Sequence, residues 1–174
     1  MLLQKKLIIG IILLTIYAPP AKAQGRPLHE VQAAIIFNVL RFTQWPNETI
    51  NEPFILGVRG DQNLFATLKT TYQNKFKGSR PIVVNDLQSI DDVSKCNLLF
   101  LGESKLKEFQ KAKEITSGKP ILCITGAESY GKKGAGVNLT IVDDKMVIEI
   151  NETTISQNGL KISSTLLSMA KIIR

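Results

Sequence analysis

Apolar positions after residue 25 follow a helical spacing. Between Arg26 and Trp45, large apolar side chains recur every three or four residues, and Pro46 follows directly. This spacing places the apolar side chains on one face of a helix, whereas proline cannot donate the backbone hydrogen bond that a helix interior needs. The sequence therefore predicts a helix over Arg26–Trp45 with a wide apolar face.

Four later segments are short, continuously apolar runs. They are Pro53–Gly60, Pro81–Asn85, Leu98–Leu101 and Ile121–Thr125. Unbroken runs of this length are typical of parallel strands that are buried on both faces. Helices are expected after the first run, where Asp61 is a good N-cap, and over Glu103–Thr116, which separates the last two runs.

Toward the end of the chain the pattern changes to alternation. Large apolar residues occupy every second position from Val137 to Ile141 and again from Met146 to Ile150, with Asp143-Asp144 between them. This pattern predicts an antiparallel hairpin. Apolar residues at helical spacing return over Glu152–Arg174, which predicts a closing helix whose regular part begins near Gly159.

These elements predict one α/β domain with the architecture of a three-layer sandwich. Its sheet is expected to have six strands, mostly parallel, with a C-terminal antiparallel hairpin and helices on both faces. No internal repeat or linker interrupts residues 24–174, so this range is expected to be a single domain.

Residues 1–23 have the pattern of a secretory signal peptide. Lys5 and Lys6 precede the apolar stretch Leu7–Ala18, and Ala21-Lys22-Ala23 is a small-x-small cleavage site. As a helix the apolar stretch would span about 18 Å, well short of the ~30 Å hydrocarbon core of a membrane. We therefore expect cleavage after Ala23 and export from the cytoplasm.

Cleavage of the signal peptide weakens the indication of a nucleic-acid partner that the net positive charge gives. Removal of residues 1–23 takes away three lysines and no acidic residue, so the formal charge of the chain falls from +7 to +4. The lysines between Lys105 and Lys113 are interleaved with glutamates, as on a solvated helix face. A nucleic-acid partner would require a basic stripe or a basic patch with aromatic residues, and neither is present in the sequence.

Export makes a disulfide between the two cysteines possible, because an oxidising compartment permits one. Cys96 precedes one predicted strand, whereas Cys123 lies inside the next. If these strands are parallel neighbours, the two thiols are offset by several residues at about 3.3 Å each, beyond the reach of a disulfide. A Cys96–Cys123 bridge remains open, but we expect two buried, inert thiols.

No catalytic constellation stands out in the sequence. A nucleophilic Ser or Cys needs a base, and the single histidine, His29, lies at a predicted helix start. One His and two separated Cys also argue against a zinc site. The glycines of Gly131–Gly136 lead into a strand rather than a helix, so this segment is expected to be a mobile loop and not a phosphate-binding loop. We expect no enzyme activity, no metal and no cofactor.

Several residues remain as candidates for contacts with a partner or a ligand. They are Arg41, Trp45, Arg59, Lys132, Lys133 and Asn151. Trp45 is more readily explained as a core anchor, Arg41 as a solvated residue that could instead pair with Glu149, and Asn151 as a helix cap. Ser163, Ser164 and Leu167 are candidates for close helix packing, inside the fold or across a dimer.

Five segments in fixed order resemble the YfiR family of bacterial periplasmic regulatory proteins. They are Val31–Pro46, which ends in Trp-Pro, then Cys96–Leu101, Pro120–Thr125, Val147–Asn151 and Gly159–Ala170. The resemblance covers essentially the whole chain after the signal peptide. It implies a six-stranded sheet flanked by helices and a non-enzymatic role.

The resemblance also implies partners. Members of the family act as periplasmic repressors that bind the periplasmic domain of an inner-membrane diguanylate cyclase, often as a dimer. They are released by an OmpA-like outer-membrane lipoprotein or by redox stress. The best-known members carry two disulfides, whereas this chain has two cysteines, which argues against redox sensing by disulfide rearrangement. The alternative hypothesis is a periplasmic small-ligand-binding protein that feeds a sensor or transporter, with its site near Gly60, Gly102 and Thr125 at the carboxyl ends of the strands.

Overall fold

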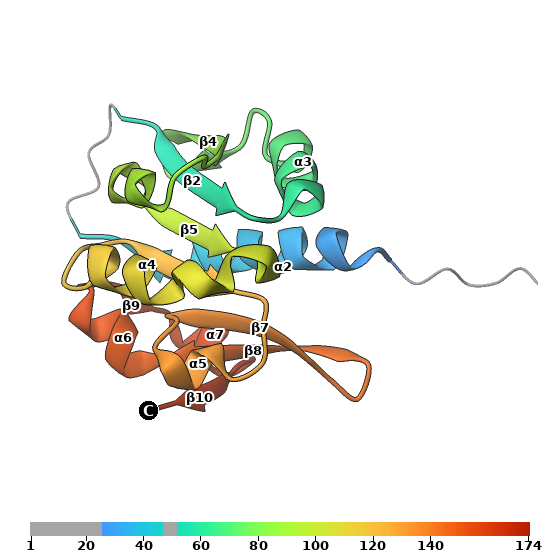
Figure 1. Ribbon diagram of the computed structural model, residues 1–174, viewed down its shortest axis with the longest axis vertical. Coiled ribbons are helices and arrows are strands. Elements are labelled where there is room, and N and C mark those ends of the chain that lie inside the picture. The colour runs from blue at the N-terminus through green and yellow to red at the C-terminus, as the bar shows by residue number, and fades with distance from the viewer. Residues whose placement is uncertain (1–25, 47–51) are drawn as a thin grey trace, which may run out of the picture.

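The computed structural model describes residues 26–46 and 52–174, and the predicted signal peptide lies outside them. An eight-stranded sheet forms the centre, with the strand order β10-β8-β7-β6-β5-β2-β4-β3 (Figure 1). The main strands are β2 (Phe54–Arg59), β4 (Arg80–Asp86), β5 (Leu98–Leu101), β6 (Leu122–Thr125), β7 (Val137–Val142) and β8 (Lys145–Asn151). These are the six predicted strands.

Two short strands extend the sheet beyond the prediction, one at each edge. They are β3 (Phe76–Lys77), which is antiparallel to β4, and β10 (Lys171–Ile173), which is parallel to β8. The β7–β8 hairpin is antiparallel as well, and the remaining pairs of neighbouring strands in this sheet are parallel. The predicted α/β class, with a mostly parallel sheet and a C-terminal hairpin, is confirmed.

Helices cover both faces of the sheet, which therefore separates two apolar cores. In Figure 1, α4 (Phe109–Thr116) lies in front of the sheet and α2 (Leu28–Phe42) behind it, together with α3 (Gln62–Thr71). Alternate residues of β5 point to opposite cores, because Leu98 and Phe100 pack in the larger one and Leu99 and Leu101 in the other. This burial on both faces explains why the strands read as unbroken apolar runs.

The predicted closing helix over Glu152–Arg174 is wrong. This segment contains α6 (Glu152–Gln157), β9 (Lys161–Ile162), α7 (Ser164–Leu167) and β10. Gly159, at φ +68°, ends α6 rather than opening a helix, because the Leu160 N–H closes the turn on the Ile155 carbonyl at 3.0 Å. The strand β9 then pairs with β1 (Thr43–Gln44), a partner more than a hundred residues earlier in the chain.

Three other predicted boundaries also shift. The first helix ends at Phe42 instead of Trp45, because Thr43–Gln44 form β1. The segment Glu103–Thr116 begins as a 3-10 helix, η3 (Glu103–Glu108), and continues as α4. The expected loop at Gly131–Gly136 contains a one-turn helix, α5 (Tyr130–Lys133), which ends at Gly134 with φ +108°. Within the described ranges no helix is long and apolar enough to span a bilayer.

Candidate functional site

A cavity of about 370 Å³ opens at the sheet edge where β2, β5 and β6 end. Each of these strands is followed by a glycine at the cavity wall, namely Gly60, Gly102 and Gly126. The side chains around the cavity come from the start of α2, from the β2–α3 turn and from the β5–η3 turn: Leu28, Gln32, Asp61, Gln62, Phe100, Glu103 and Ser104. We call this cavity the carboxyl-edge cleft.

Two turns at the rim of the carboxyl-edge cleft touch each other directly. A Cβ on Gly102 would stand 2.5 Å from the carbonyl oxygen of Gly60, so only glycine allows this approach. The Ser104 hydroxyl donates a hydrogen bond of 2.7 Å to the same carbonyl. Asp61 caps α3 as predicted, since its Oδ1 accepts from the Leu64 N–H at 2.9 Å.

Arg59, a predicted contact residue, is fully engaged inside the protein beside this cleft. Its Nε and Nη2 donate to the Glu108 carboxylate at 2.8 and 2.9 Å. Its Nη1 donates to the carbonyls of Leu87 and Gln88 at 3.0 and 2.8 Å. The hydrogen bond from Arg59 lowers the pKa of Glu108, and its partner carboxylate raises the pKa of Arg59. Arg59 therefore ties β2 to the chain that follows β4 and to η3.

Gln32 is the polar residue that the sequence reasoning missed at this site. It lies on the buried face of α2 and is only 6% exposed. The structure gives its amide no hydrogen bond to any described residue, while Gly126 lies close to its Nε2. The sequence pattern could have singled out Gln32, because this polar residue interrupts the apolar stripe of α2 one turn before Ile36.

A row of hydrogen-bonded polar side chains crosses the neighbouring part of the sheet. Thr125, Asn138, Glu149 and Lys171 occupy successive register positions on β6, β7, β8 and β10. Thr125 Oγ1 donates to Asn138 Oδ1 at 2.6 Å, and Asn138 Nδ2 donates to Glu149 Oε2 at 2.9 Å. Lys171 Nζ completes the row with Glu149 Oε1 at 3.3 Å. We call this set the polar row.

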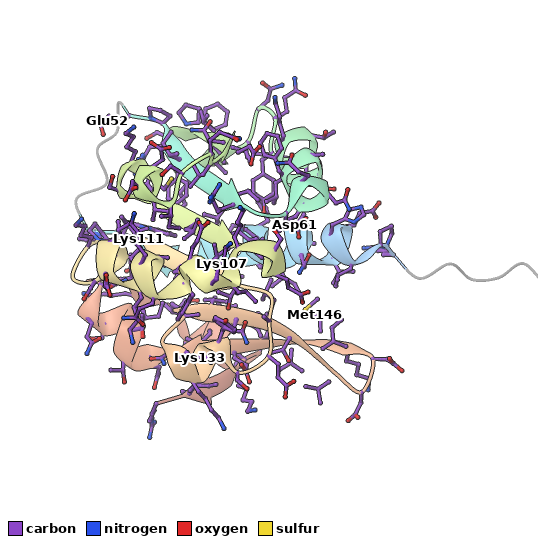
Figure 2. The ribbon with its side chains drawn as sticks, viewed as in Figure 1. Glu52, Asp61, Lys107, Lys111, Lys133 and Met146 are labelled. Carbon is purple, nitrogen blue, oxygen red and sulfur yellow. The ribbon has the colours of Figure 1, made fainter. Side chains whose placement is uncertain are left out.

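The lysines of α5 are exposed and are carried by a helix that packs on the polar row. A Cβ on Gly131 would approach Glu149 Oε2 to 3.0 Å, so glycine permits this close packing. Asn151 fastens the same helix through its Nδ2, which donates to the Gly131 carbonyl at 2.9 Å. Lys132 and Lys133 are exposed. Lys133, which Figure 2 labels, has its Nζ 4.1 Å from the centre of the Tyr130 ring.

Trp45 and Asn151 hold internal positions. The Trp45 indole is buried edge-on against Phe54, and its Nε1 donates to the Asn97 carbonyl at 3.2 Å. Trp45 therefore lies at the start of β2, at the opposite edge of the sheet from the carboxyl-edge cleft. Asn151 is buried and caps α6, since its Oδ1 accepts from the Thr154 N–H at 2.9 Å.

Arg41 and the α7 residues lie on the surface or near it. Arg41 is exposed, with its guanidinium 5.6 Å from the centre of the Phe42 ring, while Glu149 pairs with Lys171 instead. Ser163 caps α7 through the Leu166 N–H, Ser164 is exposed, and Leu167 lines a cavity of about 200 Å³ beneath α6. The structure thus brings Asn151, Lys132 and Lys133 together around α5 and leaves Arg41, Trp45 and Arg59 apart from them.

Both cysteines are buried and free. The register of β5 and β6 places Leu99, not Cys96, opposite Cys123. Burial raises the pKa of Cys96 to about 11 and that of Cys123 to about 12, so the reactive thiolate is scarce at both positions at neutral pH.

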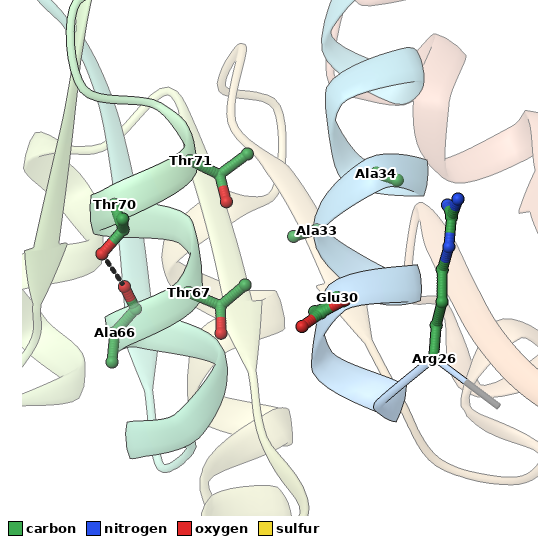
Figure 3. Close-up of a pocket in the computed structure, with 8 residues that line it drawn as sticks. All are labelled: Arg26, Glu30, Ala33, Ala34, Ala66, Thr67, Thr70 and Thr71. Atoms are coloured by element: carbon green, nitrogen blue, oxygen red, sulfur yellow. Dashed lines mark hydrogen bonds between the residues drawn. The ribbon is translucent and has the colours of Figure 1, made fainter. Parts of the chain in front are cut away.

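A second cavity, of about 550 Å³, lies between α2 and α3 (Figure 3). Its walls carry small residues, among them Ala33 and Ala34 on α2 and Ala66 and Thr67 on α3, with Arg26 and Glu30 at one end. Residues 26–46 and 52–174 contain no group of three or more His, Cys, Asp or Glu side chains that could hold a metal ion. His29 is half-buried in the first turn of α2.

Two solved structures share this fold at low sequence identity. One is described as an ABC domain in complex with L-Trp from Streptococcus pneumonia, with a TM-score of 0.55, 11% identity, and coverage of 83% of this chain and 60% of that one. The other is a conserved domain protein from Vibrio cholerae O1 biovar eltor, with a TM-score of 0.55, 15% identity, and coverage of 84% and 60%. The chain thus spans 60% of the length of each, and at these identities the likeness concerns the fold alone.

A comparison with curated proteins finds no match. A model of the DUF4154 family, described as YfiR/HmsC-like, matches residues 29–171. The matched range runs from the first turn of α2 to β10 and so includes the carboxyl-edge cleft, the polar row and α5. The chain therefore belongs to the YfiR/HmsC-like family.

Proposed function

We propose that this protein is a periplasmic regulator that represses an inner-membrane diguanylate cyclase, or a similar sensor, by binding its periplasmic domain. The observation that carries the proposal is the family match over residues 29–171, because the family is regulatory. Export through cleavage after Ala23 and control of cyclic-di-GMP are part of the same proposal. The proposal also includes a homodimer and its release by an OmpA-like outer-membrane lipoprotein.

The exposed side of α5 is the contact surface that we propose for the partner. Lys132 and Lys133 stand side by side on a helix fixed by Gly131 and Asn151, so their charges are presented without a large ordering cost. Lys111 on the neighbouring α4 is paired with Asp91 at 2.8 Å, whereas Lys107 projects from η3 and adds to the exposed charge (Figure 2). An acidic patch on the partner domain would complement these lysines.

Deletion of the gene, with the cyclase intact, is the test of the function. Cyclic-di-GMP is expected to rise and to return to its former level on complementation, and the protein is expected to co-purify with the periplasmic domain of the cyclase. An unchanged cyclic-di-GMP level would contradict the proposal.

The surface has its own test. Complementation with Lys132→Glu/Lys133→Glu is expected to fail and co-purification to be lost, because reversed charges repel an acidic partner. Lys119→Glu is the matched control, since Lys119 is also exposed but lies before β6, at the opposite end of the strands from α5. Wild-type repression by the double variant would exclude α5 as the contact.

A further inference from the structure

The proposed partner contact does not use the carboxyl-edge cleft. The volume of this cleft, about 370 Å³, lies within the range of about 300–1,000 Å³ that is typical of small-molecule sites. Glycines form much of the wall, which leaves backbone groups close to any molecule inside.

Gln32 is the first observation that points to a ligand. The residue is only 6% exposed, its side chain lines the cleft, and its amide makes no hydrogen bond with the described part of the chain. An apolar residue would suit the buried face of α2 better than an amide that has no partner in the described part of the chain. The side chain lines the cleft, so a molecule in the cleft could pair with it.

The charge of the cleft is the second observation. The ionisable side chains in its wall are Asp61 and Glu103, both acidic. The basic side chains nearby are engaged with Glu108, since Arg59 is held by two hydrogen bonds and Lys105 Nζ lies 3.9 Å from the same carboxylate. Asp61 uses Oδ1 to cap α3 and leaves Oδ2 without a hydrogen bond to a described residue. A ligand in this cleft therefore meets negative charge.

The third observation is an apolar part of the cleft wall. Leu28 is 49% exposed at the start of α2, and Phe100 of β5, although only 1% exposed, reaches the cleft beside Gly126 with the tip of its ring. We propose that the carboxyl-edge cleft binds a small organic amine. Its ammonium group is held by Asp61 and Glu103 and donates a hydrogen bond to Gln32, while its short apolar chain packs on Leu28 and Phe100.

Titration calorimetry of the exported chain with n-butylamine and with 1,4-diaminobutane tests this inference. Both probes are expected to bind. Gln32→Leu is expected to weaken binding at least about tenfold without lowering the unfolding temperature, because it removes the hydrogen bond to the amine and leaves an apolar side chain on the buried face of α2. Asp61→Asn is expected to weaken binding similarly while preserving the α3 cap, since asparagine is an equally good N-cap.

Glu30→Gln is the matched control, because Glu30 is an exposed acid on α2 that lines the other cavity. Its affinity for both amines is expected to equal that of the wild type. Absence of binding by both amines, tighter binding of n-butyrate or inorganic phosphate, or full affinity in Asp61→Asn would each overturn the inference. None of these outcomes bears on the cyclase, whose repression is measured separately in cells.

Discussion

Asn138 Nδ2 donates a hydrogen bond of 2.9 Å to Glu149 Oε2 across the β7–β8 hairpin, and both side chains are buried. Asn138 also accepts from Thr125, and Glu149 also accepts from Lys171. A carboxylate can be buried in this sheet because an amide on one side and an ammonium group on the other satisfy its oxygens. The polar row therefore depends on Asn138, which joins its two halves.

Asn138→Ala is expected to lower the free energy of unfolding by about 2–3 kcal/mol, because it leaves the Thr125 hydroxyl and one Glu149 oxygen buried without partners. Urea denaturation measures this difference. Asn85→Ala is the matched control, since Asn85 is an exposed asparagine on β4, and a change below about 0.5 kcal/mol is expected there. Equal losses in the two variants would contradict the role of the polar row.

The Arg59–Glu108 pair predicts a pH dependence of stability. Because the pKa of Glu108 is lowered in the folded state, the pair stabilises the fold above the unfolded-state pKa of about 4.3, and this contribution is lost as the pH falls through the folded value. Glu108→Gln is therefore expected to be less stable than the wild type at pH 7, and the difference is expected to shrink below about pH 4. A constant difference from pH 7 to pH 3 would be inconsistent with the pair.

Arg59→Ala is expected to cost about 1–3 kcal/mol at pH 7, since it leaves the Leu87 and Gln88 carbonyls and Glu108 without their donor. Arg174→Ala is the control, because Arg174 forms a surface pair with Glu152 at 3.6 Å and is almost fully exposed. Its effect on the unfolding free energy is expected to be close to zero.

Two buried threonines are expected to respond in opposite directions to replacement by valine. Thr43 and Thr125 are both 0% exposed, but Thr43 Oγ1 is a buried oxygen for which no described residue supplies a partner. Thr43→Val is expected to stabilise the protein by about 1 kcal/mol, whereas Thr125→Val is expected to destabilise it by about 1–3 kcal/mol. Urea denaturation of both variants provides the comparison, and a loss in Thr43→Val as large as that in Thr125→Val would contradict it.

The two cysteines are expected to react slowly with a disulfide reagent such as DTNB in the native protein. Burial raises the pKa of Cys123 to about 12 and that of Cys96 to about 11, and it also limits access to both sulfurs. In urea, without a reductant, both thiols are expected to react rapidly. Fewer than two reactive thiols in the unfolded protein would indicate a bridge and contradict the free state of both residues.

The central sheet could be predicted from the sequence because its signal is local. Leu98–Leu101 and the other apolar runs are buried on both faces, and Asp61 lies one residue before the helix that it caps. The segment after Asn151 could not be predicted in this way. Its short strands form only because β9 meets β1 and β10 meets β8, and such long-range pairings leave no periodic pattern in the chain.

The residues of the candidate site were also predictable only where their signal in the sequence is local. Gln32 could have been noticed as a polar residue within an apolar stripe, because that contrast is local. By comparison, the engagement of Arg59 could not be foreseen, since Glu108 lies 49 residues away and the Leu87 carbonyl 28 residues away. The sequence interpretation therefore left Arg59 as a contact candidate, whereas the structure gives it an internal role beside the cleft.

The hydrogen bonds of Arg59 and Ser104 affect the rate at which a molecule can bind in the carboxyl-edge cleft. They hold the turns that follow β2 and β5 against each other before any molecule arrives. The walls of the cleft are therefore already in place when a molecule enters, and its association requires no prior opening of a loop. Its uptake should follow simple one-step kinetics, with a rate that rises linearly with concentration.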